Sequence, residues 1–154
     1  SKGGKGGKRR QPPDGDDNEE VRQNPSSLDL PHVEELRKSD SRWVKHFKED
    51  KDALQVIDAG EGRYDFYLNM DNVHLQLEIK ENRKIDHRLL EARYKYGMVL
   101  IGISLLEHFE GKDAEKDKSD KMDDSSTFKR IYQLSKAVSP ILLPMIASLG
   151  DLEI

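Results

Sequence analysis

The chain has no cysteine among its 154 residues. This absence excludes disulfide bonds, thiolate zinc sites and a cysteine nucleophile, and it fits a reducing compartment, so we expect a cytoplasmic protein. The positive charges at the N-terminus are not followed by the apolar segment that a secretory signal requires. Apolar runs also fall short of the ~20 residues that a membrane-spanning helix needs. The sequence therefore predicts a protein that does not associate with membranes.

Apolar residues are scarce as well. Hydrophobic residues make up 34% of the chain and charged residues 36%, whereas the apolar share of globular domains is typically ~45–50%. The poorest segments are residues 1–27, which we expect to be a disordered basic-then-acidic tail, and residues 111–126, which we expect to be a mobile charged linker. Residues 28–154 then form a single domain. A domain this small is marginal unless a partner buries additional surface.

The tail opens with a repeated Lys-Gly-Gly and a basic triplet. Such side chains could contact a nucleic-acid backbone. However, an acidic run follows at once and the net charge is −4, so a solvated linker is the favoured interpretation. The first residue is Ser1, which fits either loss of an initiator methionine or a fragment of a longer polypeptide. The basic residues of the tail are Lys2, Lys5, Lys8, Arg9 and Arg10.

The longest apolar segment, residues 98–106, lies in a predicted central helix. That helix begins at Asp86 as its N-cap and ends at Gly111. A helix that is apolar on every face must be covered by other protein, because this one is too short to cross a membrane. Gly97 and Gly102 inside it each cost ~1 kcal/mol relative to alanine. Their presence indicates close packing of another backbone, from either the sheet or the last helix.

Three runs have the composition of β-strands, and two glycines in residues 58–62 predict a hairpin loop between the first two. Residues 73–80 alternate between apolar and polar, which favours a strand, although a helix capped by Asn69 or Asp71 is the alternative. Residues 32–38 fit either a strand or a helix. The three strand-like runs are residues 53–57, 63–68 and 73–80.

The C-terminal part predicts two helices. Ser125 or Ser126 caps the first, and Pro140 begins the second with Ser139 as its cap. Pro144 should kink or break this second helix. Together these elements predict an α+β fold, with a small antiparallel sheet of about three strands packed on the long central helix. The C-terminal helices complete or extend the core.

One pattern suggests catalysis. Glu78 and Lys80 would share one face of a strand, with Asp65 and Asp71 upstream. Nucleases of the restriction-endonuclease class hold Mg²⁺ with such carboxylates and use the lysine to help activate water. Any half-exposed strand alternates in this way, so a Glu-x-Lys pair also arises by chance. The Mg²⁺-dependent nuclease is therefore the alternative hypothesis, not the leading one.

Other ligand motifs are weaker. Residues 58–62 match the Asp-x-Gly-x-Gly box of histidine-kinase-like and gyrase-like ATPases, and residues 20–24 offer a Glu-x-x-x-Asn. Pro25 and the lack of an apolar face make the required helix at residues 20–24 implausible, so the hairpin loop is preferred. The five histidines lack metal-binding spacing. We therefore expect neither a metal nor a cofactor.

Residues 66–72, 94–102 and 139–144 carry a resemblance to known proteins. They are similar to the C-terminal region of large prokaryotic proteins with a histidine-kinase/gyrase-type ATP-binding domain, and to subtilase-like proteins with similar tails. The resemblance implies a non-catalytic accessory or assembly module, because the catalytic residues of such proteins lie upstream.

The leading hypothesis is therefore a non-enzymatic interaction module, either the C-terminal part or a subunit of a larger prokaryotic complex. Its interface would be formed by the central helix and the apolar C-terminal segment, through association with another protein or with itself. The predicted interface residues are Tyr94, Met98, Ile101, Leu105, Ile141, Leu142, Met145, Ile146 and Leu149.

Overall fold

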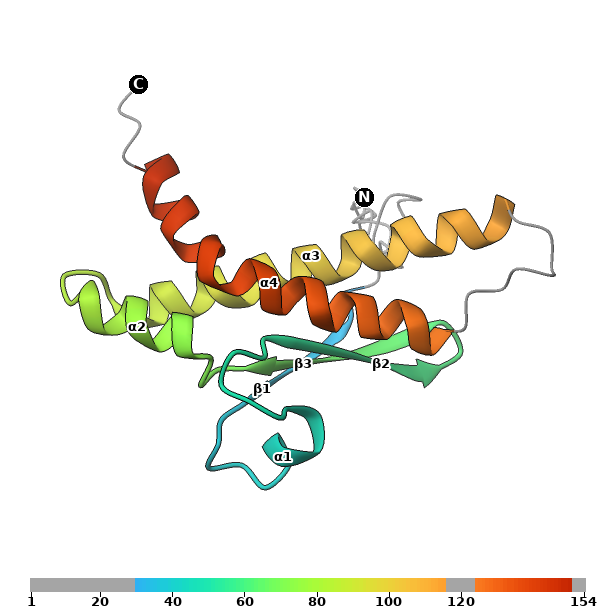
Figure 1. Cartoon of the computed structure of the whole chain (residues 1–154), viewed down its shortest axis with the longest axis horizontal. Helices are drawn as coiled ribbons and strands as arrows, with labels where there is room; N and C mark the ends of the chain where they lie inside the picture. The colour runs from blue at the N-terminus through green and yellow to red at the C-terminus, as the bar shows by residue number, and fades with distance from the viewer. Residues whose placement is uncertain (1–29, 116–123, 151–154) are drawn as a thin grey trace, which may run out of the picture. The chain divides into compact units, whose positions relative to one another are not determined.

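The described residues form a sheet of three strands in the order β1-β3-β2 (Figure 1). The structure is a computed structural model that describes residues 30–115 and 124–150. Strands β2 (Leu54–Gly60) and β3 (Arg63–Asn69) are antiparallel, whereas β1 (His32–Leu36) runs parallel to β3. The α+β class is confirmed. The sheet is mixed rather than antiparallel, because β1 supplies the third strand in place of residues 73–80.

The β2–β3 hairpin confirms the predicted loop. Its two loop residues, Glu61 and Gly62, have φ angles of 57° and 73°, which are the left-handed conformations that a tight two-residue hairpin turn requires. Asp58 supports the turn, because its Oδ1 accepts a hydrogen bond from the amide of Gly60 at 2.8 Å. The glycines at this loop therefore serve the chain reversal.

The prediction of a strand at residues 73–80 is wrong, because these residues form helix α2 (Val73–Glu81). The side chain of Asn72 favours the helix by capping its first turn. Its side-chain oxygen accepts hydrogen bonds from the amides of His74 and Leu75 at 2.9 and 3.1 Å, which satisfies two donors of the first helical turn. Among the nine described residues of α2, Leu75 alone is buried. A helix with one buried residue leaves little helical periodicity in the sequence.

Helix α3 (His87–Glu115) begins where the sequence predicts. Asp86 caps it, since its Oδ1 accepts the amide of Arg88 at 2.9 Å. The helix does not stop at Gly111, which is a second wrong prediction. Glycine within a helix costs only ~1 kcal/mol, and the residues that follow it include alanine, lysine and glutamate, which favour helix. The predicted linker, residues 111–126, is thus helical at both ends, where it belongs to α3 and to a last helix that begins at Asp124, and residues 116–123 lie outside the described part.

Helix α4 (Asp124–Gly150) is continuous, although the sequence predicts a new helix at Pro140. Figure 1 shows that α4 bends in its last third. Proline has no N–H to donate to the carbonyl four residues earlier, which for Pro140 is that of Lys136. The hydroxyl of Ser139 donates to this oxygen instead, at 2.8 Å. One local hydrogen bond thus replaces the bond that the proline removes.

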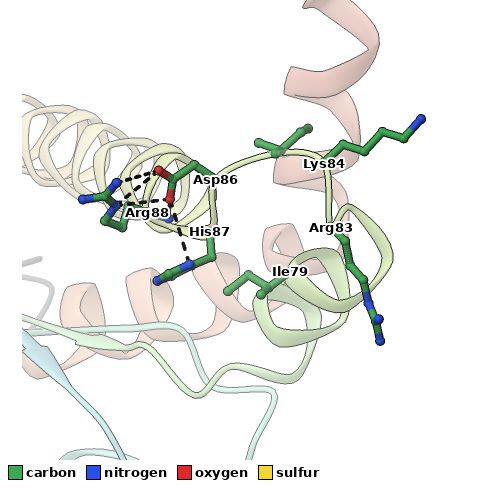
Figure 2. A pocket seen from close by; sticks show the side chains of 7 residues that line it. Ile79, Arg83, Lys84, Asp86, His87 and Arg88 are labelled. Atoms are coloured by element: carbon green, nitrogen blue, oxygen red, sulfur yellow. Dashed lines mark hydrogen bonds and ion pairs between the residues drawn. The ribbon is translucent and has the colours of Figure 1, made fainter.

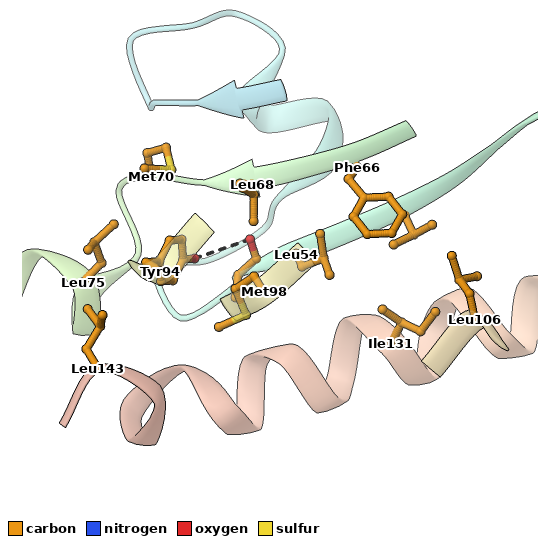
Figure 3. Packing of buried hydrophobic residues seen from close by; sticks show 12 residues of the cluster. Leu54, Phe66, Leu68, Met70, Leu75, Tyr94, Met98, Leu106, Ile131 and Leu143 are labelled. Carbon is orange, nitrogen blue, oxygen red and sulfur yellow. Dashed lines mark hydrogen bonds between the residues drawn. The ribbon is translucent and has the colours of Figure 1, made fainter. Parts of the chain in front are cut away.

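Helices α3 and α4 pack on one face of the sheet, and short helix α1 (Trp43–His46) lies beyond the sheet on the other side (Figure 1). Buried side chains from both helices and from β2 and β3 form the main core (Figure 3). Within the described ranges, none of the helices combines the length and hydrophobicity needed to cross a bilayer. The predicted tail, residues 1–27, lies outside the described residues. Fully buried members of the core include Leu54, Phe66, Leu68, Tyr94, Met98 and Ile131.

Candidate interaction surface

Two contacts set the register of α3 against α4. Gly97 faces Leu142, and the guanidinium of Arg130 lies over the ring of Phe109, 5.5 Å from its centroid. The two α3 residues are twelve positions apart and so are the two α4 residues, in opposite order. The helices are therefore antiparallel, in agreement with Figure 1.

This register places exposed apolar residues of both helices on one side. Successive residues of a helix are rotated by about 100°, so positions one before and three after the contact residue lie about 100° and 60° to the same side of it. Tyr96 and Leu100 hold these positions on α3, and Ile141 and Met145 hold them on α4. In an antiparallel pair, equal rotations bring side chains to the same side of the pair. The four residues therefore share one face.

The sheet lies on the opposite side of the helix pair. The buried residues Tyr94 and Met98 stand three before and one after Gly97, and Ser139 and Leu143 stand likewise around Leu142. These positions are rotated in the other direction. The exposed apolar face thus points away from the sheet, and we call it the outer face. Among the described residues of α3 and α4, its members are Leu89, Tyr96, Leu100, Leu134, Ile141, Met145 and Leu149.

The outer face is both exposed and uncharged at its centre. Tyr96 and Leu100 are 67% and 66% exposed, and Met145 is 58% exposed. Residues 96–106 and 137–150 contain no Asp, Glu, Lys or Arg, in a chain of which 36% is charged. At ~150–200 Å² for each large side chain, the seven residues present roughly 600–800 Å² to solvent. Contiguous apolar patches on monomers rarely exceed ~300–600 Å².

The structure separates the predicted interface residues into three groups. Tyr94 and Met98 are fully buried in the chain's own core, where the hydroxyl of Tyr94 donates to the carbonyl of Asn69 at 2.9 Å. They are not accessible to a partner. The members that pack against this core or are half-buried are Ile101, Leu105, Leu142 and Ile146. The exposed members are Ile141, Met145 and Leu149.

Sequence reasoning missed four residues of the outer face. A run that is apolar on every face does not reveal which of its sides meets the sheet. Residues 98–106 therefore could not indicate which side of α3 faces solvent. The missed residues on α4 and α3 carry the same 3–4 spacing as the predicted ones. They are Leu89, Tyr96, Leu100 and Leu134.

The geometry behind the nuclease hypothesis is absent. Glu78 and Lys80 lie on helix α2, where residues two apart point away from each other. Glu78 accepts a hydrogen bond from Asn82 at 2.8 Å, and Asp71 accepts the amide of Lys38 at 2.6 Å. Asp65 is in β3. Across residues 30–115 and 124–150, no group of three or more histidines and carboxylates is placed to hold a metal ion.

A cluster of buried polar groups surrounds Asn69, and its hydrogen bonds have a structural role. Asn69 accepts from the indole Nε1 of Trp43 at 2.8 Å and donates to the carbonyl of Asp52 at 2.7 Å. Asn72 donates to the same carbonyl at 3.1 Å. Burial and the nearby Asp52 raise the pKa of Tyr94, so it stays protonated as a donor. These bonds join α1, β3 and α3.

A basic depression of about 680 Å³ lies where α2 meets α3 (Figure 2). Arg83 and Lys84 line it without forming ion pairs to other described residues. Asp86 already occupies the N-terminus of α3, and its hydrogen bonds to Arg88 lower its pKa to about 2. The position at which a helix would bind an anion is thus filled by the chain's own carboxylate. The depression is wide open to solvent, so we assign no ligand to it.

Comparison with family models, curated proteins and solved structures finds no match to this chain. The resemblance to the C-terminal regions of ATP-binding proteins therefore stays a prediction. The most distinctive feature of the described residues is the outer face of α3 and α4.

Proposed function

We propose that this chain is a non-catalytic interaction module that enters a larger protein assembly through the outer face of α3 and α4. The observation that carries the proposal is an exposed apolar surface, with no charged residue in the segments 96–106 and 137–150 at its centre, on a chain that is otherwise rich in charge. Its estimated area of roughly 600–800 Å² approaches the ~800 Å² that each partner buries in a standard protein interface.

The energetics support association. At ~25 cal/mol per Å², covering this surface contributes about 15–20 kcal/mol before costs. Loss of translational and rotational freedom opposes binding by ~4–15 kcal/mol. The favourable surplus is sufficient for a specific complex. If the same surface stays in water, this favourable free energy is not gained. We therefore assign the surface to an interface.

The nature of the assembly follows from the sequence. The resemblance of residues 66–72, 94–102 and 139–144 supports a prokaryotic complex of which this chain is a subunit or a C-terminal part. The absence of cysteine supports a cytoplasmic one. In this proposal the chain contributes binding, and any chemistry belongs to its partners.

Substitutions on the outer face test the proposal in the cells that naturally produce the protein. The double variant Leu100→Lys with Met145→Lys places two charges on the face at exposed positions, so it should fold normally. Val44→Lys is the matched control, because Val44 is 74% exposed but lies on α1, across the sheet. We expect the tagged wild-type chain and the control to elute in a complex larger than the 17.7 kDa chain, and the double variant to elute alone. Equal elution of all three would refute the proposal.

A further inference from the structure

Two opposite charges lie on the outer side of α3, one before and one after its uncharged centre. Arg93 lies seven residues before Leu100 and Glu107 lies seven residues after it. Seven residues are close to two helical turns, so both side chains share the phase of Leu100. Neither forms an ion pair with another described residue; Arg93 is half-buried and Glu107 is exposed.

The outer side of α3 also has the spacing of a helix–helix seam. Its positions alternate by four and three residues, as at the a and d positions of a coiled coil. This seam is apolar at its centre and carries one positive and one negative residue toward its ends. The positions are Leu89, Arg93, Tyr96, Leu100, Ile103 and Glu107.

We infer that the occupant of the outer face is a second copy of this chain, packed with its α3 antiparallel to the first about a two-fold axis near Leu100. This inference rests on the proposed function. In a two-fold interface, if residue i meets residue j, then j also meets i. Arg93 of each copy therefore meets Glu107 of the other, which forms two ion pairs. Leu100 meets its own counterpart at the axis.

Other arrangements of two copies are less favourable. Parallel α3 helices would bring Arg93 against Arg93 and Glu107 against Glu107, and like charges at an interface oppose association. The antiparallel arrangement converts both repulsions into attractions. Since residues 96–106 carry no charge, no further like-charge contact arises along the centre of the seam.

The remaining segments of the chain are poor candidates to cover the face. Residues 1–29, 116–123 and 151–154 together hold few large apolar side chains, against seven on the outer face. A second copy instead offers an identical apolar area, close to the ~800 Å² per partner of a standard interface. The large apolar residues in those segments are Val21, Leu28, Met122, Leu152 and Ile154.

Charge reversals on the full chain test the pairing directly. In Arg93→Glu the two-fold contact becomes Glu against Glu, and in Glu107→Arg it becomes Arg against Arg. Mixing the two single variants restores two opposite-charge pairs in the mixed dimer. Lys45→Glu, at an exposed position of α1, is the control for the change in net charge. Thermal unfolding of each variant by circular dichroism checks that the fold is kept.

Sedimentation equilibrium supplies the readout. We expect the wild type and Lys45→Glu to be dimers of twice 17.7 kDa. Each single reversal should raise the dimer dissociation constant at least tenfold. The mixture of the two single variants should recover most of the affinity, and so should a chain that carries both Arg93→Glu and Glu107→Arg. A wild type that stays monomeric overturns the inference, and so does a dimer insensitive to the reversals or not rescued by mixing. If the monomer nonetheless depends on Leu100 and Met145 for its native complex, the proposed function stands with a different protein as the occupant.

Discussion

Gly97 of α3 lies so close to Leu142 of α4 that a Cβ atom at Gly97 would come within 2.7 Å of Leu142 Cδ2. The contact lets the two helices approach, and it determines which of their residues face solvent. A similar approach occurs at Gly102, where a Cβ atom would come within 2.6 Å of the Phe66 ring. Close packing at both glycines is therefore confirmed, but the neighbouring atoms belong to side chains of the last helix and of the sheet and not, as predicted, to another backbone.

Gly97→Ala should destabilise the chain by about 1 kcal/mol, because the overpacking cost of ~1–3 kcal/mol exceeds the helix-propensity gain of ~1 kcal/mol. In a Leu142→Ala background the obstacle is gone, and the same substitution should stabilise by about 1 kcal/mol. Urea denaturation of the four chains measures this coupling. An effect of the same sign in both backgrounds would contradict the close approach.

Ser139→Ala should destabilise the chain by ~1–2 kcal/mol, because the buried Ser139 hydroxyl is the donor to the Lys136 carbonyl. Pro140→Ala restores an amide donor to that carbonyl. In the Pro140→Ala background, the serine substitution should therefore cost less than ~0.5 kcal/mol. Thermal or urea unfolding of the wild type, the two single variants and the double variant provides the test. Equal costs in both backgrounds would show that the hydroxyl does not replace the hydrogen bond that an amide at residue 140 would donate.

Asn69→Ala should destabilise by ~3 kcal/mol, since it leaves the indole N–H of Trp43 and the amide of Asp71 without their acceptor. Trp43 is the one tryptophan of the chain, so its fluorescence reports on this position, and we expect a red shift as α1 loosens. Asn82→Ala, at the partly buried end of α2, serves as the control and should leave the emission unchanged. An unshifted Trp43 emission spectrum for Asn69→Ala would show that the hydrogen bonds of Asn69 do not hold α1 in place.

Asp86→Asn tests the electrostatics of the α3 N-terminus. The pKa of Asp86 is lowered from 3.8 to about 2 by its hydrogen bonds to Arg88, so its carboxylate stabilises the fold above pH 3.8 and loses this effect as the pH falls toward 2. The melting temperature of the wild type should exceed that of Asp86→Asn near neutral pH, and the difference should shrink through this acid range. Glu81→Gln removes an exposed carboxylate of α2 and should show no such trend. A difference that is constant with pH would count against the charged cap.

Local chemistry made several elements predictable. Asp86 marks the start of α3 because a carboxylate satisfies free amides at a helix end, and Gly62 marks the hairpin because glycine accepts a positive φ. Residues 73–80 were mispredicted because their alternation imitates a strand, while the decisive cap at Asn72 acts through only two hydrogen bonds. Pro140 was mispredicted because the hydroxyl that compensates for it lies on the adjacent residue.

By itself, the sequence determined where the apolar segments lie, and it predicted a partner surface that includes Ile141, Leu142, Met145, Ile146 and Leu149. Of these five residues, the structure leaves Ile141, Met145 and Leu149 exposed. Only the tertiary structure decided which side of α3 faces solvent, and hence that Tyr94 is core while Tyr96 is surface. The physical reason is that a helical segment that is apolar on every side has no polar face to mark the side that will be exposed. Its orientation is set by packing, through the glycines that admit Leu142 and Phe66.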